Sequence, residues 1–387
     1  MTQVIINGRI VTPKAILENH SLVIKDGKIA AIVEGNNTSG YDKVIDAQGN
    51  YVAPGNIDMH IHGGDGADFT DGTPEAFYKI ARVHAIHGTT SMFATLAASP
   101  RNVIDNCLKV CEECMKDPKE GANILGIHIE GNYLSPNMVG AQDANCITKP
   151  DPAEYTAIAD STTALKRWTA APEIEGALEF GKFATSRGIV VALGHTQAAY
   201  KEVLAGYENG YVLATHFYNA MTNVHKNREF KKEGTVEACY LVDGMNVEVI
   251  SDGIHVPATI LKLIYKIKGA DKIALITDAQ KPTGGNDTST LDPKRFLIED
   301  GVVKLADRSA LAGSIATTDR LVRTMIQQAE VPVLDAFKMG SETPARIMKV
   351  IDRKGTLEVG KDADIIIVND NIDVQKTIVM GKLIYEN

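Results

Sequence analysis

Short apolar runs that are typical of β-strands recur along most of this chain, and helical stretches separate them. Eight such runs occupy residues 56–63, 89–97, 124–131, 167–173, 188–196, 211–220, 246–256 and 272–280. Most of the segments between them repeat apolar residues with the 3.6-residue period of a helix, as in 75–87, 101–116, 197–208 and 257–268. Alternating strands and helices favour a parallel sheet, and eight repeats predict an α/β fold of the (β/α)8, TIM-like barrel type.

The two ends of the chain follow a different pattern. Residues before 55 form short alternating strands broken by Asn-Gly, Asp-Gly and Gln-Gly turns, and the C-terminal stretch returns to this style. A chain of 387 residues has room for one large barrel and a small companion. We therefore predict a small β-sandwich domain built from residues 1–54 and 351–387, with the barrel at 55–350. Residues 281–316 are expected to form a long loop, then a hairpin, over the barrel mouth.

Charge and hydropathy exclude several functional classes. The net charge of −9 argues against a nucleic-acid-binding surface, which would be basic. No apolar run approaches the roughly 18 residues that a membrane-spanning helix needs. The N-terminal residues alternate like a strand and lack the basic and apolar regions of a signal peptide. We predict a cytoplasmic protein without a membrane or nucleic-acid partner.

The five cysteines include a CxxC pair, Cys111 and Cys114, which invites a zinc or redox interpretation. These two residues share a helical stripe with Cys107 and apolar neighbours, so a buried helix face with reduced thiols is the preferred interpretation. An odd cysteine count also argues against a disulfide framework.

Polar side chains with metal-binding or acid–base chemistry gather where the predicted strands end. Barrel enzymes keep their chemistry at the C-terminal ends of the strands. The residues that fall there are His60 and His62 in the first run, Glu130 in the third, His195 in the fifth, His216 in the sixth, His255 after the seventh and Asp278 in the eighth. Since His60 and His62 are two residues apart, they point to the same face of their strand.

Five of these residues predict a metal site at the barrel mouth: His60, His62, Glu130, His195 and His216. Imidazole nitrogens and a carboxylate oxygen suit zinc, iron and related first-row ions. Any one histidine alone is as readily a core or surface residue, but five potential ligands at strand ends favour a site.

Asp278 and His255 are the candidate catalytic residues. A carboxylate beside a metal can take a proton from water and later hand it to a leaving amine, although Asp278 could instead be a further metal ligand. His255 could donate a hydrogen bond to an oxyanion, or could position the substrate.

Six motifs occur in a characteristic order: "PGNIDMHIHGG", "HIEGNY", "LGHTQA", "THFYNAM", "DGIHV" and "LAGSIATT". The chain resembles the amidohydrolase superfamily and, within it, the N-acetylglucosamine-6-phosphate deacetylases. The first motif is shared by many amidohydrolases, whereas the others are much narrower. The resemblance extends to "VGKDADIIIVN" near the C-terminus, and it implies metal-dependent hydrolysis of the acetamide of a phosphorylated amino sugar.

The resemblance also assigns roles. Glu130, His195 and His216 match the principal metal ligands of the family. His60 and His62 match a pair that holds a second metal in some members, so one or two divalent ions are expected, zinc first and iron or another first-row ion as alternatives. By the same resemblance Asp278 is the catalytic aspartate, and His255 helps to polarise the substrate carbonyl.

Further matches concern the sugar phosphate. Asn219 and Ala220 match a backbone stretch that contacts it. Arg228 matches a phosphate-binding arginine that usually reaches across a dimer interface, which implies a homodimer.

The chain departs from the family pattern near the site. Asn132 stands where the family has proline, and Gln142 stands where it has a phosphate-contacting histidine. Gln142 can still donate a hydrogen bond to the substrate but carries no positive charge. Lys281, beside the catalytic aspartate, or Lys226 could compensate. These departures put the identity of the sugar in doubt.

Three alternatives remain open at this stage. The substrate could be another sugar, such as N-acetylgalactosamine 6-phosphate. The chain could be a different amidohydrolase, such as a dihydroorotase, hydantoinase or D-aminoacylase, but Lys166 lies at the wrong end of the fourth strand for a metal-bridging lysine. A catalytically inactive binding protein is the third, and the complete set of ligands argues against it.

Overall fold

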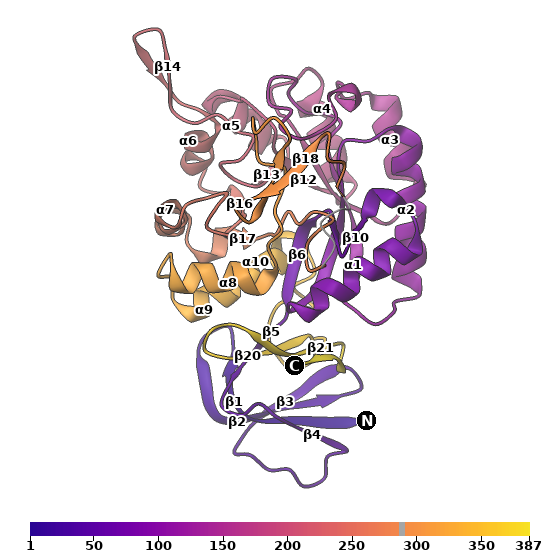
Figure 1. Cartoon of the computed structure of the whole chain (residues 1–387), viewed down its shortest axis with the longest axis vertical. Coiled ribbons are helices and arrows are strands. Elements are labelled where there is room, and N and C mark those ends of the chain that lie inside the picture. Colours follow the sequence, from indigo (N-terminus) through magenta and orange to yellow (C-terminus); the bar gives the residue numbers. More distant parts are fainter. Residues whose placement is uncertain (286–290) are drawn as a thin grey trace.

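The computed structural model describes residues 1–285 and 291–387, and its centre is a parallel eight-stranded sheet (Figure 1). Each strand overlaps one run predicted from the sequence, which confirms the TIM-like barrel. The strands, in their order around the sheet, are β6 (Asn56–Ile61), β9 (Thr89–Leu96), β10 (Asn123–Glu130), β11 (Leu165–Ala170), β12 (Val190–Leu193), β13 (Tyr211–Ala214), β16 (Asn246–Val249) and β17 (Ile273–Leu275).

Backbone hydrogen bonds join the first strand to the segment that follows the last one. The N–H of Asp278 donates to the carbonyl oxygen of His60 at 2.9 Å, and the N–H of His62 donates to that of Ala279 at 3.0 Å. These bonds close the sheet, and they bring His60, in β6, and His62, just after it, beside Asp278.

Helices surround the barrel as the 3.6-residue periodicity predicts (Figure 1). They are α1 (Pro74–Ile86), α2 (Arg101–Lys116), α3 (Pro152–Ser161), α4 (Ala177–Ser186), α5 (Tyr200–Glu208), α6 (Thr235–Leu241), α7 (Ala258–Lys268), α8 (Thr318–Gln327), α9 (Val333–Gly340) and α10 (Glu342–Ile347). On α2, Cys107, Cys111 and Cys114 are buried and unpaired by disulfides, as predicted. Burial raises the pKa of Cys107 to about 12, so this thiol is protonated at neutral pH. None of the helices in the described part of the chain has the length and apolar character needed to cross a membrane.

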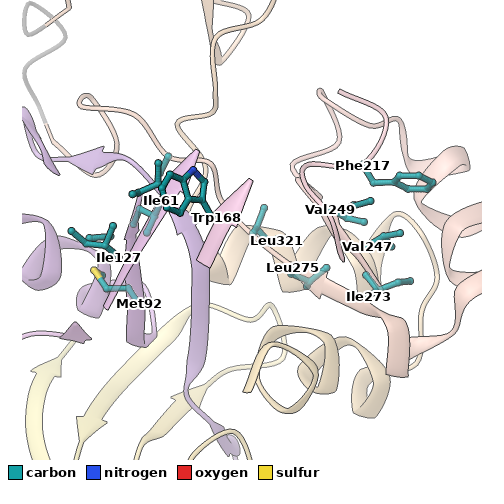
Figure 2. Packing of buried hydrophobic residues seen from close by; sticks show 14 of the residues in the cluster. Ile61, Met92, Ile127, Trp168, Phe217, Val247, Val249, Ile273, Leu275 and Leu321 are labelled. Carbon is teal, nitrogen blue, oxygen red and sulfur yellow. The ribbon is translucent and has the colours of Figure 1, made fainter. Parts of the chain in front are cut away.

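Apolar side chains fill the space between the strands and the helices. Figure 2 shows Trp168 among these residues, and Val247 and Leu275 on the neighbouring strands β16 and β17. The indole N–H of Trp168 donates to the carbonyl oxygen of Gly131 at 2.8 Å, which ties the core to the loop that follows Glu130. The packing of Trp168 in the core therefore helps to position the C-terminal end of β10, where Glu130 lies.

Another apolar cluster joins the barrel strands to α10. It combines Met59 and Ile276 with Ala345 and Ile347 of α10.

Strands from the two ends of the chain form one other large sheet, seen below the barrel in Figure 1. Its members are β1 (Thr2–Val11), β2 (Ile16–Lys25), β3 (Lys28–Glu34), β4 (Lys43–Asp46), β5 (Tyr51–Pro54), β20 (Ile365–Val368), β21 (Val374–Val379) and β22 (Lys382–Glu386). β5 pairs with β20, so the N-terminal and C-terminal segments join here. The division of the chain at residues 54/55 and 350/351 stays a prediction.

Small hairpins lie outside the two large sheets. β14 (His225–Asn227) and β15 (Phe230–Lys232) form an exposed hairpin that projects from the molecule (Figure 1). β18 (Phe296–Glu299) and β19 (Val302–Leu305) form the hairpin expected within residues 281–316, of which 286–290 lie outside the described residues. β7 (Gly63–Gly64) and β8 (Ala67–Asp68) follow the histidine pair.

Candidate metal and catalytic site

A cavity of about 980 Å³ opens at the C-terminal ends of the barrel strands. Loops from both halves of the barrel contribute to its walls. The predicted site residues that line it are His62, Glu130, Gln142, His195, His216, Asn219, Ala220, His255 and Asp278. His60 is fully buried directly beside this group, whereas Arg228 is exposed and lies at the turn between β14 and β15.

Glu130, His195 and His216 come together as one group of potential metal ligands, which we call the outer triad. The Oε1 atom of Glu130 lies 2.9 Å from Nε2 of His216 and 3.3 Å from Nε2 of His195. The two Nε2 atoms are 3.1 Å apart.

Backbone carbonyl groups orient both histidines of the outer triad. Nδ1 of His195 lies 2.9 Å from the carbonyl oxygen of Met138, and Nδ1 of His216 lies 3.1 Å from that of Asn219. A carbonyl oxygen only accepts, so each Nδ1 carries a hydrogen, and Nε2 is the atom of each ring that faces the centre. The two Nε2 atoms are therefore the ones that could bind a shared cation.

His60, His62 and Glu130 form a second group, the inner triad, which shares Glu130 with the outer one. The Nε2 atoms of His60 and His62 are 3.3 Å apart, and Nε2 of His62 is 3.2 Å from Oε2 of Glu130. Oδ1 of Asp278 lies 3.1 Å from Nε2 of His62 and 3.6 Å from Nε2 of His60. A carboxylate that is not part of either triad is therefore in direct contact with the inner one.

A buried ion pair between Glu248 and Arg167 contacts the inner triad through His60. Oε2 of Glu248 lies 3.2 Å from Nδ1 of His60, and it also accepts the backbone N–H of His216 at 3.2 Å. Oε1 of Glu248 pairs with the guanidinium of Arg167, and both side chains are fully buried. Arg167 also donates to the carbonyl oxygen of Met59 at 2.9 Å, which anchors the pair to β6.

The electrostatics of the site favour positive charge. Burial opposes charge on His60, but the negative charges of Glu130 and Asp278 outweigh it and raise the pKa of His60 to about 9. Burial likewise opposes the charge of Glu130, yet the surrounding imidazoles hold its pKa well below the usual range. A buried pocket that stabilises two carboxylates through nearby cations suits a divalent metal, and nitrogen and oxygen ligands fit zinc or another first-row ion.

Three of the candidate metal-binding and catalytic residues adopt a left-handed backbone conformation that is rare for residues other than glycine. The φ angles are 47° at His195, 30° at His216 and 50° at Asp278. Each of these residues lies just beyond the end of a barrel strand. Backbone strain of this kind persists where surrounding contacts impose it, and it clusters at functional sites.

His255 is held by a carboxylate from its own loop. Its Nδ1 lies 2.8 Å from Oδ2 of Asp252, whose Oδ1 accepts the backbone N–H groups of Ile254 and His255 at 2.9 Å. Nε2 of His255 is buried without a hydrogen-bond partner among the described residues, although the side chain lines the cavity. A ligand atom in the cavity would satisfy this nitrogen.

Three residues expected to contact substrate already make hydrogen bonds within the protein. The carbonyl oxygens of Asn219 and Ala220 are occupied, by His216 Nδ1 and by the N–H of Thr196. Gln142 lines the cavity, but its amide bonds to the N–H of Ala98 and to Glu130. Its predicted contact with substrate stays a prediction.

The two lysines that could replace the charge of the family's phosphate-contacting histidine lie in different parts of the structure. Lys281 lines the cavity and pairs with Asp71 at 2.8 Å. Lys226 lies on β14, in the same projecting hairpin as Arg228.

The residues that orient the ligands were not among those predicted from the sequence. Glu248 and Arg167 each place a charge inside a barrel strand, and this unusual position was the available signal. Asp252 lies in the motif "DGIHV", three residues before His255. The carbonyl group of Met138 carries no sequence signal.

Imidazoles and carboxylates gathered at the mouth of a closed barrel define a metal-dependent hydrolase of the amidohydrolase type. The amidohydrolase family model matches residues 51–384. An N-acetylglucosamine-6-phosphate deacetylase of Lysinibacillus sphaericus is 32% identical, over 95% of this chain and 93% of the relative. An N-acetylgalactosamine-6-phosphate deacetylase of Escherichia coli O157:H7 is also 32% identical, over 99% of both chains. The chain belongs to the amidohydrolase family and, within it, to the group of amino-sugar-phosphate deacetylases.

A solved structure agrees with this assignment. The N-acetylglucosamine-6-phosphate deacetylase of Pasteurella multocida superposes with a TM-score of 0.93 at 28% identity, and the match covers both chains completely.

Proposed function

We propose that this protein hydrolyses N-acetylglucosamine 6-phosphate to glucosamine 6-phosphate and acetate in the cytoplasm. The observation that carries the proposal is the pair of triads that share Glu130, with Asp278 and His255 at the same cavity. The relatives named above act on phosphorylated N-acetyl amino sugars, which supports this substrate class.

The outer triad would hold the principal divalent metal, and the inner triad offers a second position. We propose zinc, with iron or another first-row ion as the alternative, because imidazoles and carboxylates make up both triads. When bound, the metal supplies a Lewis acid that lowers the pKa of water and polarises a carbonyl group.

Asp278 is proposed as general base and then general acid. Its Oδ1 takes a proton from the attacking water while the water oxygen adds to the acetamide carbon. Asp278 then returns the proton to the amide nitrogen, the C–N bond breaks, and acetate and the amino sugar leave. The contact between Asp278 and His62, at 3.1 Å, fixes the carboxylate in place for both transfers.

His255 is proposed to bind the carbonyl oxygen of the acetamide. Asp252 holds Nδ1, so that Nε2 is the free atom of the ring. When protonated, Nε2 donates to the oxygen, whose negative charge grows as water adds.

Binding of the phosphate is proposed to involve a second copy of the chain. Arg228 lies at the exposed tip of the β14–β15 hairpin and does not line the cavity of its own chain. In a homodimer, the projecting hairpin of one protomer could bring Arg228 to the cavity of its partner. Asn219 and Ala220, which line the cavity, would then contact the sugar phosphate from the same chain.

N-acetylgalactosamine 6-phosphate is the second candidate substrate. The Escherichia coli relative named for that sugar is as similar to this chain as the Lysinibacillus protein. The two sugars differ in the orientation of one hydroxyl group, so the same metal chemistry serves both.

Acetate release tests the proposal. Metal-replete protein is assayed with N-acetylglucosamine 6-phosphate, N-acetylgalactosamine 6-phosphate and unphosphorylated N-acetylglucosamine, with Asp278→Asn as the control. A kcat/KM that is highest for the first substrate, and a control without activity, would support the proposal. Preference for the second sugar would shift the assignment to the alternative, and no acetate from any of them would refute the substrate class.

A further inference from the structure

Gln142 makes two hydrogen bonds that together fix the orientation of its amide group. Its Oε1 accepts the backbone N–H of Ala98 at 2.8 Å, and its Nε2 donates to Oε2 of Glu130, also at 2.8 Å. Because a backbone N–H only donates, Oε1 must face Ala98. The amide nitrogen therefore faces Glu130, the residue that both triads share.

Gln142 donates a hydrogen bond to only one of the two carboxylate oxygens of Glu130. Oε1 faces His195 and His216, whereas Oε2 faces His62 and the amide of Gln142. A hydrogen bond on Oε2 restrains rotation of the carboxylate about its last torsion, which is otherwise broad. Oε1 is thereby kept directed at the outer triad.

A second amide side chain, Asn132, restrains the same loop through hydrogen bonds to Ser99 rather than to Glu130. Asn132 accepts the N–H of Ser99 at 3.1 Å and donates to the Ser99 carbonyl at 2.9 Å, so it fastens the same loop after β9. Asn132 does not line the cavity, and its amide makes no hydrogen bond to Glu130 within the described residues. The chain thus contains an internal control for the contact between Gln142 and Glu130.

We propose that Gln142 is a positioning residue for the metal site: it holds Glu130 with Oε1 directed at His195 and His216. This inference rests on the proposed metal-dependent function. Residues that orient a metal ligand typically change metal affinity by about 10- to 100-fold when they are replaced. Gln142 therefore acts on the metal through Glu130.

The test compares the Zn²⁺ affinity of metal-free protein, Gln142→Leu and Asn132→Leu by competition with a chromogenic chelator. Leucine approximates the size of each amide but makes no hydrogen bond. We expect Zn²⁺ to bind Gln142→Leu about 10- to 100-fold more weakly, and Asn132→Leu with unchanged affinity. The absorption spectrum of the Co²⁺-substituted protein should change in Gln142→Leu alone, since it reports the ligand geometry.

Three results would overturn the proposal. Unchanged Zn²⁺ affinity in Gln142→Leu with a raised KM would mean that the residue contacts substrate. Equal losses in both variants would mean that fastening the loop is what matters. If Gln142→Leu fails to fold, Gln142→Asn, which is too short to bridge both partners, must show the weakened binding; unchanged binding in that variant would also refute the proposal. Because Zn²⁺ affinity is measured without substrate, failure of the proposed deacetylase activity is a separate result.

Discussion

The two triads share one carboxylate but obtain their orientation from different sources. In the outer triad, the carbonyl oxygens of Met138 and Asn219 hold the two histidines. In the inner triad, the carboxylate of Glu248, fixed by Arg167, holds His60. The first arrangement uses neutral loop backbone, whereas the second uses a buried ion pair in the barrel interior.

This difference affects how each triad responds to substitution and how basic its imidazoles are. Backbone carbonyls survive side-chain substitution, so the orientation of the outer triad depends on loop conformation. An anionic partner increases the basicity of a metal-binding imidazole, but removal of one member leaves an unpaired buried charge. The orientation of His60 therefore depends on side chains that a single substitution can remove, whereas backbone carbonyl groups orient His195 and His216.

Loss of the shared ligand should have the largest effect. Glu130→Gln removes the only carboxylate common to the two triads, so we expect metal binding at both to weaken by more than the roughly 100-fold seen for orienting residues. Activity should fall to background. Metal content after dialysis, measured by elemental analysis, checks this expectation. Retention of one full equivalent would show that one triad functions without Glu130.

Replacement of the proposed proton-transfer residue should come next. Asp278→Asn should lower kcat by about 10²- to 10⁴-fold, the usual contribution of general acid–base catalysis. Metal affinity should be largely retained, because Asp278 belongs to neither triad. Parallel kinetics and metal analysis separate the two effects. A variant that loses metal together with activity would identify Asp278 as a ligand of the inner triad.

Disruption of the buried ion pair should affect the inner triad selectively. Glu248→Gln leaves Arg167 buried without its partner, which should lower the free energy of unfolding by about 3–5 kcal/mol. Metal affinity at the inner triad should fall about 10- to 100-fold. Denaturant unfolding of metal-free protein and metal titration check the two parts. Equal weakening of both positions would show that the bond from Glu248 to the His216 backbone governs the outer triad as well.

The smallest effect is expected far from either triad. Arg228→Ala should raise KM for the phosphorylated sugar about tenfold, equivalent to about 1.4 kcal/mol of binding energy, with little change in kcat. Lys232→Ala, which changes an exposed lysine on β15 of the same hairpin, is the matched control. Sedimentation analysis of both variants establishes whether the dimer is intact. An unchanged KM in an intact dimer would remove Arg228 from the proposed phosphate site.

The sequence alone determined the barrel and the gathering of the histidines. Strand and helix periodicities are local properties, and the C-terminal ends of parallel strands necessarily meet at one end of a barrel. The two-residue spacing likewise predicted that His60, in β6, and His62, just after it, point to the same side of the chain.

Only the tertiary structure decided how the ligands are oriented. The bonds from Glu248 to His60, from Met138 to His195 and from Gln142 to Glu130 join residues that are 188, 57 and 12 positions apart. Such contacts depend on loop paths and on the stagger of the barrel strands, which local periodicity does not encode. The chemical character of each ligand is thus a property of the sequence, whereas its direction is set by chain segments that meet only in the folded protein.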